Sequence, residues 1–516
     1  MNITSLNPVK AGDSEYSIAE APIRWIPLAI GLSVVTLLWD LFKLPQLLGF
    51  APYAFGDPGC NLTIFYLVSH GYRPTIDFGY AYGLLGILAN QAWFHAVPLK
   101  PVGYQAFSIM CQLFVVCAMA RIAGVLAFRP TQVVFLFVAI GRAVMPTYFT
   151  FAHGMEAVLI SSAAAEQARG ARGNALALTT AAVFAKPTMG YVYSALLLTL
   201  MARDLYRRRI SALAPWLERI RPAAVVGLSL CALLGLMYGL APLWRTVLPL
   251  SGMGNYKALR NGFFTAEGSN FWHPAHSNWH YYAGTMIGLW AVATAYLIWG
   301  ATPAAWRLWE SPAVKSDSIG MRRDEMIVSC VLLHLAFVFF FYANSWSWIY
   351  YSWILIVGAA AVPIDKPIHR YALCALVVIA AGTYYALGVD SVSEWNSMSR
   401  TPATANLWSS AGARDEWSGV IAAIKGRRAI ALHAAGAVEV LYPQFERPVG
   451  VYFEPGLMTA TEIQREVTRI ESADVIVVPN DVAGWGGYTL TPETERALAS
   501  FKQTERGAYL SVYERR

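Results

Sequence analysis

The sequence FAPYAFGDPGCNLTIFYLVSHGYRPTIDFGYAYG, residues 50–83, is a polar and aromatic interval between long apolar segments. It follows the first long apolar run, residues 25–48, and it contains the carboxylates of Asp57 and Asp77 together with Arg73. In a chain that is otherwise largely apolar, such an interval is where polar side chains meet water. We therefore expect the functional site to include this first loop.

The composition around this loop is that of a protein with many membrane spans. Of the 516 residues, 56% are hydrophobic and only 14% are charged, whereas charged residues make up about 25% of ordinary soluble domains. Continuous apolar runs of about 18 to 25 residues are each long enough to cross a bilayer as a helix. The net charge of +7 comes from Lys and Arg beside these runs, as the positive-inside rule predicts. We therefore expect membrane lipids as partners and no nucleic acid.

The chain divides into two parts by composition. Residues 1–389 are expected to form an α-helical polytopic membrane domain of about ten to twelve helices, with outer loops at 51–79 and 244–282. Residues 390–516 are expected to form a small soluble α/β domain on the outer side, because short apolar runs there alternate with amphipathic ones. The strands expected in this tail are 429–432, 438–441, 449–453, 475–478 and 509–513, and the helices are 417–425, 461–470 and 492–502.

Two segments do not fit a simple series of crossings. Basic residues place the loop 51–79 outside and the loop 121–130 inside, and two full crossings cannot separate them. We therefore expect the segment 80–97 to lie at the outer interface or to re-enter the membrane. The segment 174–202 has basic residues on both flanks, which predicts two short half-helices that meet at Lys186.

Asp57 stands in the sequence Gly-Asp-Pro-Gly, directly after the first span. An outward carboxylate at this place could act as a general base on an acceptor hydroxyl or bind a divalent cation. The same sequence is also typical of a turn, in which Asp57 would cap the N-terminus of a helix. The residues alone leave both interpretations open.

The pattern that follows Asp57 resembles the first outer loop of the GT-C superfamily of membrane glycosyltransferases, which includes protein O-mannosyltransferases and lipid A aminoarabinose transferases. In that superfamily an acidic residue soon after the first span is the usual catalytic position, and Asp57 matches it. Leu84 stands where the family has proline, and Pro58 follows Asp57 where the family commonly has a second acid. The residues that match the family's loop motif are Gly71, Pro74, Asp77, Phe78, Tyr82 and Gly83.

The resemblance implies a glycosyltransferase of the bacterial inner membrane. It would move a sugar from a polyprenyl-phosphate donor to an extracytoplasmic acceptor, which could be a lipid, a glycan or a protein. Asp57 would be the catalytic base or a metal ligand, with Glu156 as a second metal ligand and Mg²⁺ or Mn²⁺ as the cation. The side chains expected to shape the substrate pocket are Arg73, Asp77, Tyr82 and Glu156.

Lys186 is a functional candidate on physical grounds, because a Lys between two half-helices inside a membrane is costly unless it is paired or wetted. The phosphate of a polyprenyl carrier is a natural partner for it. The alternative is a Lys that snorkels to the interface. Glu156 is likewise either a second acid or the structural partner of Lys186.

The second polar interval, residues 244–282, carries cations and several His among Trp and Tyr. Such a loop could cradle a diphosphate or stack a sugar ring. A dedicated His metal site is not favoured, since Pro274 interrupts a continuous helix. The side chains expected to bind substrate here are Lys257, Arg260, His273 and His276.

A different class of protein, a transporter or flippase of lipid-linked saccharides, would share the same architecture. An ion-coupled transporter is expected to have charged residues within its spans and an inverted repeat. The spans of this chain carry few buried charges, and its sequence shows no inverted repeat. The sequence therefore favours the transferase.

Overall fold

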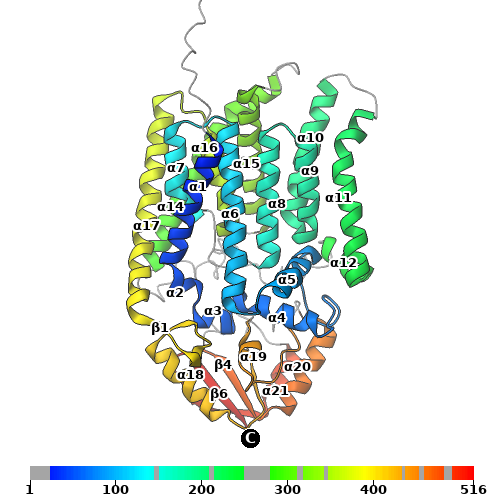
Figure 1. Ribbon diagram of the computed structural model, residues 1–516, viewed down its shortest axis with the longest axis vertical. Coiled ribbons are helices and arrows are strands. Elements are labelled where there is room, and N and C mark those ends of the chain that lie inside the picture. Colours follow the sequence, from blue (N-terminus) through cyan, green and yellow to red (C-terminus); the bar gives the residue numbers. More distant parts are fainter. Residues whose placement is uncertain are drawn as a thin grey trace, which may run out of the picture.

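The computed structural model describes residues 24–516 with internal gaps. Those gaps are 144–149, 208–213, 249–278, 311–317, 342–346, 433–435, 452–457 and 481–490. Long helices stand side by side in one bundle, and the C-terminal domain lies below one end of it (Figure 1). The helices of this bundle are α1 (Trp25–Phe42), α6 (Pro101–Val125), α7 (Pro130–Ala143), α8 (Phe151–Ala168), α9 (Arg172–Ala185), α10 (Pro187–Arg207), α11 (Ala214–Tyr238), α14 (Trp279–Glu310), α15 (Ile319–Phe341), α16 (Ser347–Ala361) and α17 (Pro367–Ser397).

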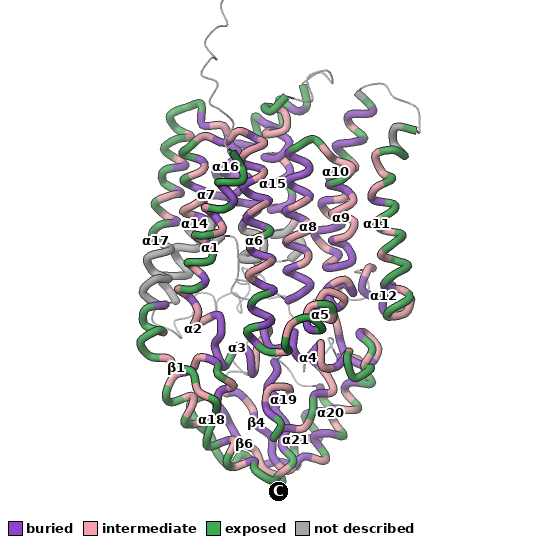
Figure 2. Tube along the Cα trace, viewed as in Figure 1, coloured by how far each residue is buried: buried purple, intermediate pink, exposed green. Residues whose placement is uncertain are grey.

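The burial pattern of these helices is that of a membrane domain. Among the described residues, α1, α6 and the Leu217–Tyr238 part of α11 are each long and apolar enough to span a bilayer. Alanines and other small residues fill the interior around α8 and α9, which lets the helices approach closely. The outer faces are exposed and apolar, with Leu228 and Leu236 of α11 72% and 87% exposed, and Figure 2 shows α11 and α17 largely green beside the purple interior. Apolar side chains that face outward are stable in lipid, so the protein is a membrane protein.

Short helices cover the end of the bundle that meets the C-terminal domain. They are α2 (Leu44–Leu47), α3 (Phe50–Phe55), α4 (Asp57–Ser69), α5 (Leu84–Ala96) and α12 (Leu240–Val247). The predicted loop 51–79 is therefore mostly helical, because α3 and α4 occupy most of it. The segment 80–97 contains α5, whose 13 residues span only about 20 Å at 1.5 Å per residue. This length is shorter than the roughly 30 Å of hydrocarbon in a bilayer, which agrees with a segment that does not cross.

The prediction of two half-helices in 174–202 is wrong in one respect. The chain does break at Lys186, between α9 and α10. However, α10 has 21 residues, which is about 31 Å and a full crossing. The two helices pack along one another as an antiparallel hairpin, so the basic residues at both flanks lie at the same end, as expected.

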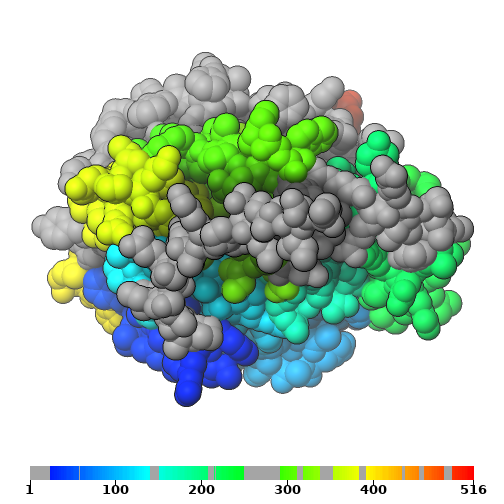
Figure 3. Space-filling view, turned by 90° about the horizontal axis from the view of Figure 1, so that it is seen from above, coloured from blue at the N-terminus to red at the C-terminus, as the bar shows by residue number. Residues whose placement is uncertain are grey.

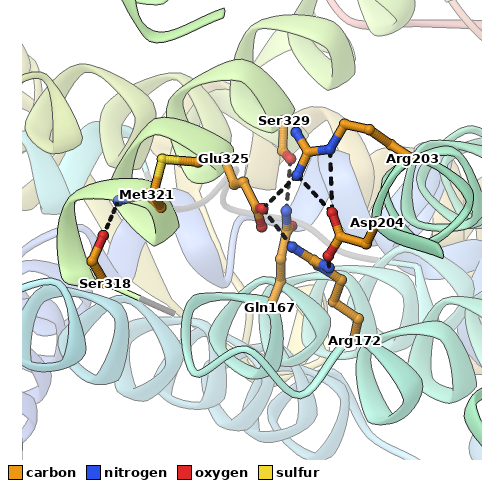
Figure 4. Close-up of polar contacts among 8 residues, drawn as sticks. All are labelled: Gln167, Arg172, Arg203, Asp204, Ser318, Met321, Glu325 and Ser329. Atoms are coloured by element: carbon orange, nitrogen blue, oxygen red, sulfur yellow. Dashed lines mark hydrogen bonds and ion pairs between the residues drawn. The ribbon is translucent and has the colours of Figure 1, made fainter. Parts of the chain in front are cut away.

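A buried ion-pair cluster ties this hairpin to α15 (Figure 4). It joins the start of α9 to the end of α10, which lie at the end of the bundle away from the C-terminal domain (Figure 1). Arg172, at the start of α9, contacts both Asp204 of α10 and Glu325 of α15. Arg203 pairs with the same two carboxylates, at 3.0 Å and 3.1 Å. Each buried carboxylate thus faces two guanidinium groups, an arrangement that offsets the cost of removing the charges from water. In the view from this end of the bundle (Figure 3), the helices cover almost all of the C-terminal domain, which is coloured orange and red.

The C-terminal domain begins after α17, which passes through position 389 and ends at Ser397. Its main sheet has the strand order β3-β4-β6-β5, with β3 and β4 parallel and the other pairs antiparallel. The predicted architecture, a helical membrane domain followed by a small α/β domain, is confirmed. The elements of the domain are β1 (Met398–Arg400), η3 (Pro402–Thr404), β2 (Trp408–Ser410), α18 (Ala411–Ala423), β3 (Ala429–Ala431), α19 (Val438–Leu441), α20 (Ala460–Ser472), β4 (Val475–Pro479), α21 (Pro492–Leu498), β5 (Phe501–Arg506) and β6 (Leu510–Arg515).

Several predicted elements of this domain need correction. Residues 438–441 form the helix α19 and not a strand, because Glu439 accepts a hydrogen bond from the Ala431 N–H and pairs with Arg469 inside the domain. Residues 449–451 form no strand, and 452–453 lie outside the described residues. The predicted helix 492–502 ends at Leu498, after which β5 begins. The predicted strands 429–432, 475–478 and 509–513 correspond to β3, β4 and β6.

Candidate functional site

The first loop is the surface on which the C-terminal domain sits. The Ala437 N–H donates to the carbonyls of Tyr53 and Ala54, at 3.0 Å and 3.1 Å, and the Thr63 hydroxyl donates to the Gly436 carbonyl at 2.5 Å. A Cβ added at Gly59 would lie 1.9 Å from the Tyr53 carbonyl oxygen, so only glycine permits this approach. The backbone at Gly59 is therefore packed against both the Tyr53 carbonyl and the Ala437 nitrogen.

Asp57 is the first residue of α4. Gly56 occupies the N-cap position, so the interpretation of Asp57 as the N-cap is wrong. A carboxylate in the first turn is compatible with the positive end of the helix dipole. The Asp57 side chain lies outside the described residues, and its catalytic role stays a prediction.

Asn61, one turn after Asp57, connects α4 to two other helices. Its side-chain carbonyl accepts from the Phe151 N–H at 3.1 Å, and its backbone carbonyl accepts from the Asn90 side chain at 2.8 Å. A cavity of about 10 Å³ lies between these helices, with Asn61, Asn90 and Thr150 in its wall, and it has room for about one water molecule. Asn61 was not predicted as a site residue, although an Asn in an apolar stretch four residues after Asp57 was a usable signal.

Lys186 lies at the centre of a polar cluster at the same end of the bundle. Its ammonium is 2.8 Å from the Nε2 of His153 and 4.0 Å from a carboxylate oxygen of Glu156. The Tyr82 ring, from the first loop, lies 4.9 Å from the His153 ring and 5.8 Å from the ammonium. The structure thus brings together three residues predicted from the sequence, Tyr82, Glu156 and Lys186.

The hydrogen bonds of His153 determine its tautomer when Lys186 is charged. An ammonium can only donate, so Nε2 of His153 accepts and Nδ1 carries the proton. That Nδ1–H donates to the hydroxyl of Thr150 at 2.7 Å, and the same hydroxyl caps α8 by accepting from the His153 backbone N–H. No role was predicted for His153 from the sequence. The spacing of Thr150, His153 and Glu156, at i, i+3 and i+6, was the available signal for one helix face.

The structure decides between the two interpretations of where Lys186 points. Its side chain is only 13% exposed and that of Glu156 is 1% exposed. Lys186 therefore lies inside the protein and does not snorkel to the interface. The buried ammonium and the buried carboxylate compensate each other's charge, so the two residues pair in this structure; a role for Glu156 as a second acid or metal ligand stays a prediction.

Arg73 and Asp77 form a second cluster, at the contact with α20. The Asp77 carboxylate accepts from the Arg73 side chain at 2.9 Å and from its backbone N–H at 2.8 Å, and Arg465 of α20 lies 3.4 Å away. Burial raises the pKa of Asp77, but the hydrogen bonds from Arg73 and the charges of Arg73 and Arg465 lower it more, so its pKa lies below the ordinary value. In this structure the pair fastens the loop to the C-terminal domain.

Glu462 makes a further link between the same two parts. Its carboxylate accepts from the backbone N–H groups of Gly79, Val451 and Thr459, at 2.7, 3.0 and 3.1 Å. Burial raises the pKa of Glu462 to about 8, although these three hydrogen bonds lower it. The first loop is therefore joined to α20 by two separate carboxylates.

The candidates in the second polar loop, Lys257, Arg260, His273 and His276, lie outside the described residues. The chain enters that loop beside the first one, since Arg245 of α12 donates to the Thr75 carbonyl at 2.8 Å. Among the described residues no group of three or more His, Cys, Asp or Glu could hold a metal ion. The Mg²⁺ or Mn²⁺ expected at Asp57 and Glu156 stays a prediction.

No family model matches the chain, and no curated protein matches it. Two solved structures of ArnT from Cupriavidus metallidurans are similar to it. The one bound to undecaprenyl phosphate has a TM-score of 0.49 and 12% identity, over 95% of this chain and 97% of that one. The one in the apo state has a TM-score of 0.48 and 13% identity, over 94% of this chain and 98% of that one. At this identity and TM-score the alignment assigns no residue role to this chain.

Proposed function

We propose that this protein is a membrane glycosyltransferase that moves a sugar from a polyprenyl-phosphate donor to an extracytoplasmic acceptor. The observation that carries the proposal is the position of Lys186. A buried cation lies against Tyr82 of the loop whose sequence resembles the GT-C motif, at the end of the bundle where α4 begins with Asp57. In transfer from a lipid phosphate, a cation can stabilise the departing phosphate and a carboxylate can accept the proton of the acceptor hydroxyl.

Each group has a definite task in the proposed reaction. The acceptor hydroxyl oxygen attacks the anomeric carbon of the sugar, its proton passes to the Asp57 carboxylate, and the bond between that carbon and the phosphate oxygen breaks. Polyprenyl phosphate leaves with the electron pair of that bond. Lys186 stabilises the negative charge on the departing phosphate, and His153 and Glu156 hold the ammonium in place.

The charges at the two ends of the bundle support an orientation in the membrane. Arg172 begins α9 and Arg203 lies in the last turns of α10, and these helix ends are opposite the C-terminal domain (Figure 1). Arg307 pairs with Asp324, which precedes Glu325 of the same ion-pair cluster, and Arg323 is the residue before Asp324. The positive-inside rule favours a cytoplasmic position for that end. The Lys186 cluster and the C-terminal domain are then on the periplasmic side of the bacterial inner membrane, where an extracytoplasmic acceptor is available.

The test uses the full chain in lipid nanodiscs with a panel of polyprenyl-phosphate sugars and candidate acceptors. Release of free polyprenyl phosphate is followed by mass spectrometry, with and without Mg²⁺ or Mn²⁺. We expect Asp57→Asn to lower turnover by at least about 100-fold while donor binding is kept, because general base catalysis contributes about 10² to 10⁴. The matched control is Asp415→Asn, which changes an exposed carboxylate of α18.

Two results would contradict the proposal. Undiminished turnover in Asp57→Asn would remove Asp57 from the mechanism. Binding of the donor without consumption, by wild type across all acceptors, would favour the transporter or flippase instead.

A further inference from the structure

An open groove of about 880 Å³ lies on the C-terminal domain where it meets the membrane domain. The outer face of α20 lines it, together with Tyr72 from the loop after α4. Figure 1 shows α20 directly below α4 and this loop. The volume is in the range of about 300 to 1,000 Å³ that small-molecule sites usually have, and none of the functional residues considered so far accounts for the groove.

The α20 wall presents hydroxyl and amide groups in a regular stripe. Thr461, Gln464 and Thr468 are exposed at i, i+3 and i+7, so they lie on one face of the helix, and all three line the groove. Such side chains donate and accept hydrogen bonds without carrying charge. The face is therefore suited to a ligand with many hydroxyl groups.

The charges in the groove are balanced. Glu446 and Arg447 line it as neighbours of opposite sign. Arg465 lies 3.4 Å from the Asp77 carboxylate. The buried Arg469 is paired with Glu439 and Glu466, at 2.7 Å and 3.0 Å. A balanced lining disfavours a bare polyanion, whereas guanidinium and carboxylate groups both hydrogen-bond to neutral hydroxyls.

Arg465 and Tyr72 give the groove a rigid, flat wall. The guanidinium of Arg465 stacks over the Tyr72 ring at 5.0 Å, and it also donates to the Asp77 carbonyl at 3.3 Å. Stacking and hydrogen bonding together fix the plane of this group before a ligand arrives, which lowers the entropic cost of binding. A flat wall beside hydroxyl and amide groups can receive the apolar face of a sugar ring.

The groove is connected to the candidate active site through α4. That helix has 13 residues, or about 20 Å at 1.5 Å per residue, with Asp57 at its first turn. Burial raises the pKa of Tyr66, in the last turn of α4, and the nearby charge of Arg447, which lines the groove, lowers it in part. A ligand in the groove is thus about one helix length from Asp57.

We propose that this groove binds the carbohydrate part of the acceptor, an oligosaccharide without dense negative charge, and that α4 spans the distance between it and the reaction. This inference rests on the proposed transferase function, because it names the acceptor class of that same site. The groove holds the distal sugars, and the end of the acceptor that carries the reacting hydroxyl extends toward Asp57.

The test measures binding to the full chain in nanodiscs without any donor. The probes are linear hexasaccharides of glucose, mannose, galactose and N-acetylglucosamine, each free and attached to a lipid anchor, with hexagalacturonate and inorganic polyphosphate for comparison. We expect a neutral hexasaccharide to bind. Its Kd should rise about tenfold in Tyr72→Ala and in Arg447→Gln, and should change little in Tyr72→Phe, which keeps the ring. The control is Arg496→Gln, which removes the same charge from an arginine whose side chain is 75% exposed on α21.

The arms of this experiment separate the possible outcomes. Equal binding of the free and the lipid-anchored hexasaccharide supports recognition of the glycan itself. If only the lipid-anchored sugar binds, and Tyr72→Ala weakens that binding, the result supports a lipid-linked source. No binding of any neutral hexasaccharide, a response only to polyphosphate, or binding that the groove variants leave unchanged would overturn the inference. Donor consumption is measured separately. Donor turnover without oligosaccharide binding would refute the groove alone, and oligosaccharide binding without donor turnover would refute the transferase alone.

Discussion

The pair of Lys186 and Glu156 permits a quantitative test of the cluster. Their charges are 4.0 Å apart, with side chains only 13% and 1% exposed. At an effective dielectric constant of about 20, two unit charges at this distance attract by about 4 kcal/mol. Lys186→Met leaves the Glu156 carboxylate buried without this cation, and breaking such a pair typically costs about 3 to 5 kcal/mol. We therefore expect Lys186→Met to lower the free energy of unfolding by about that amount.

A double-mutant cycle isolates the interaction from the loss of each side chain. Glu156→Gln keeps the shape of the side chain and removes its charge. In Glu156→Gln/Lys186→Met neither charge is left buried, so the double variant should be about 1 to 3 kcal/mol more stable than the sum of the single effects predicts. Unfolding in mixed micelles with increasing SDS gives these free energies, and Lys425→Met, at an exposed lysine, is the control. Single effects that add within about 0.5 kcal/mol would refute the pairing.

Two further predictions concern the contact between the domains. Gly59→Ala should destabilise the protein and raise hydrogen exchange around Ala437, because the new Cβ would lie 1.9 Å from the Tyr53 carbonyl oxygen and 2.6 Å from the Ala437 nitrogen. The control Gly419→Ala, whose new Cβ has nothing within 4 Å, should stabilise the protein by about 0.5 to 1 kcal/mol. Equal effects of the two variants would contradict this prediction. The raised pKa of Glu462, about 8 against 4.5, means that the folded carboxyl keeps its proton where the unfolded one loses it. The contribution of Glu462 to the free energy of unfolding is complete below about pH 4.5 and falls by up to about 1.4 kcal/mol per pH unit until about pH 8. Glu462→Gln should flatten this dependence of the unfolding free energy on pH. Equal slopes in the variant and in wild type would exclude Glu462 as the cause.

The architecture was predictable because it depends on patterns that a bilayer imposes. Continuous apolar runs, basic flanks and a change in composition after α17 are all visible in the residues themselves. The break at Lys186 was also visible, because a proline follows a charged residue inside an apolar run. The length of α10 was not, since nothing in the sequence distinguishes a half-helix from one member of a packed hairpin.

The partners of the site residues were much harder to predict. Asp77 was chosen from a loop motif, yet its partner Arg465 lies 388 positions later in the chain. Residues 438–441, Val-Glu-Val-Leu, are mostly apolar and suggest a short strand, but the buried Glu439 is held by Arg469, and tertiary contacts of this kind override a pattern four residues long. Local patterns thus indicate which residues are unusual, while the fold determines which of them meet.

The two carboxylates that join the first loop to α20 have a consequence for the proposed reaction. Asp77 and Glu462 fix the segment that ends in Tyr82, and Gly83 then donates its N–H to the Ala185 carbonyl at 2.8 Å, next to Lys186. The C-terminal domain is therefore linked to the break between α9 and α10 through a short stretch of backbone. An acceptor that binds beside α20 would act on the same stretch. The domain thus has a physical route by which acceptor binding could change the position of Tyr82 against the Lys186 ammonium.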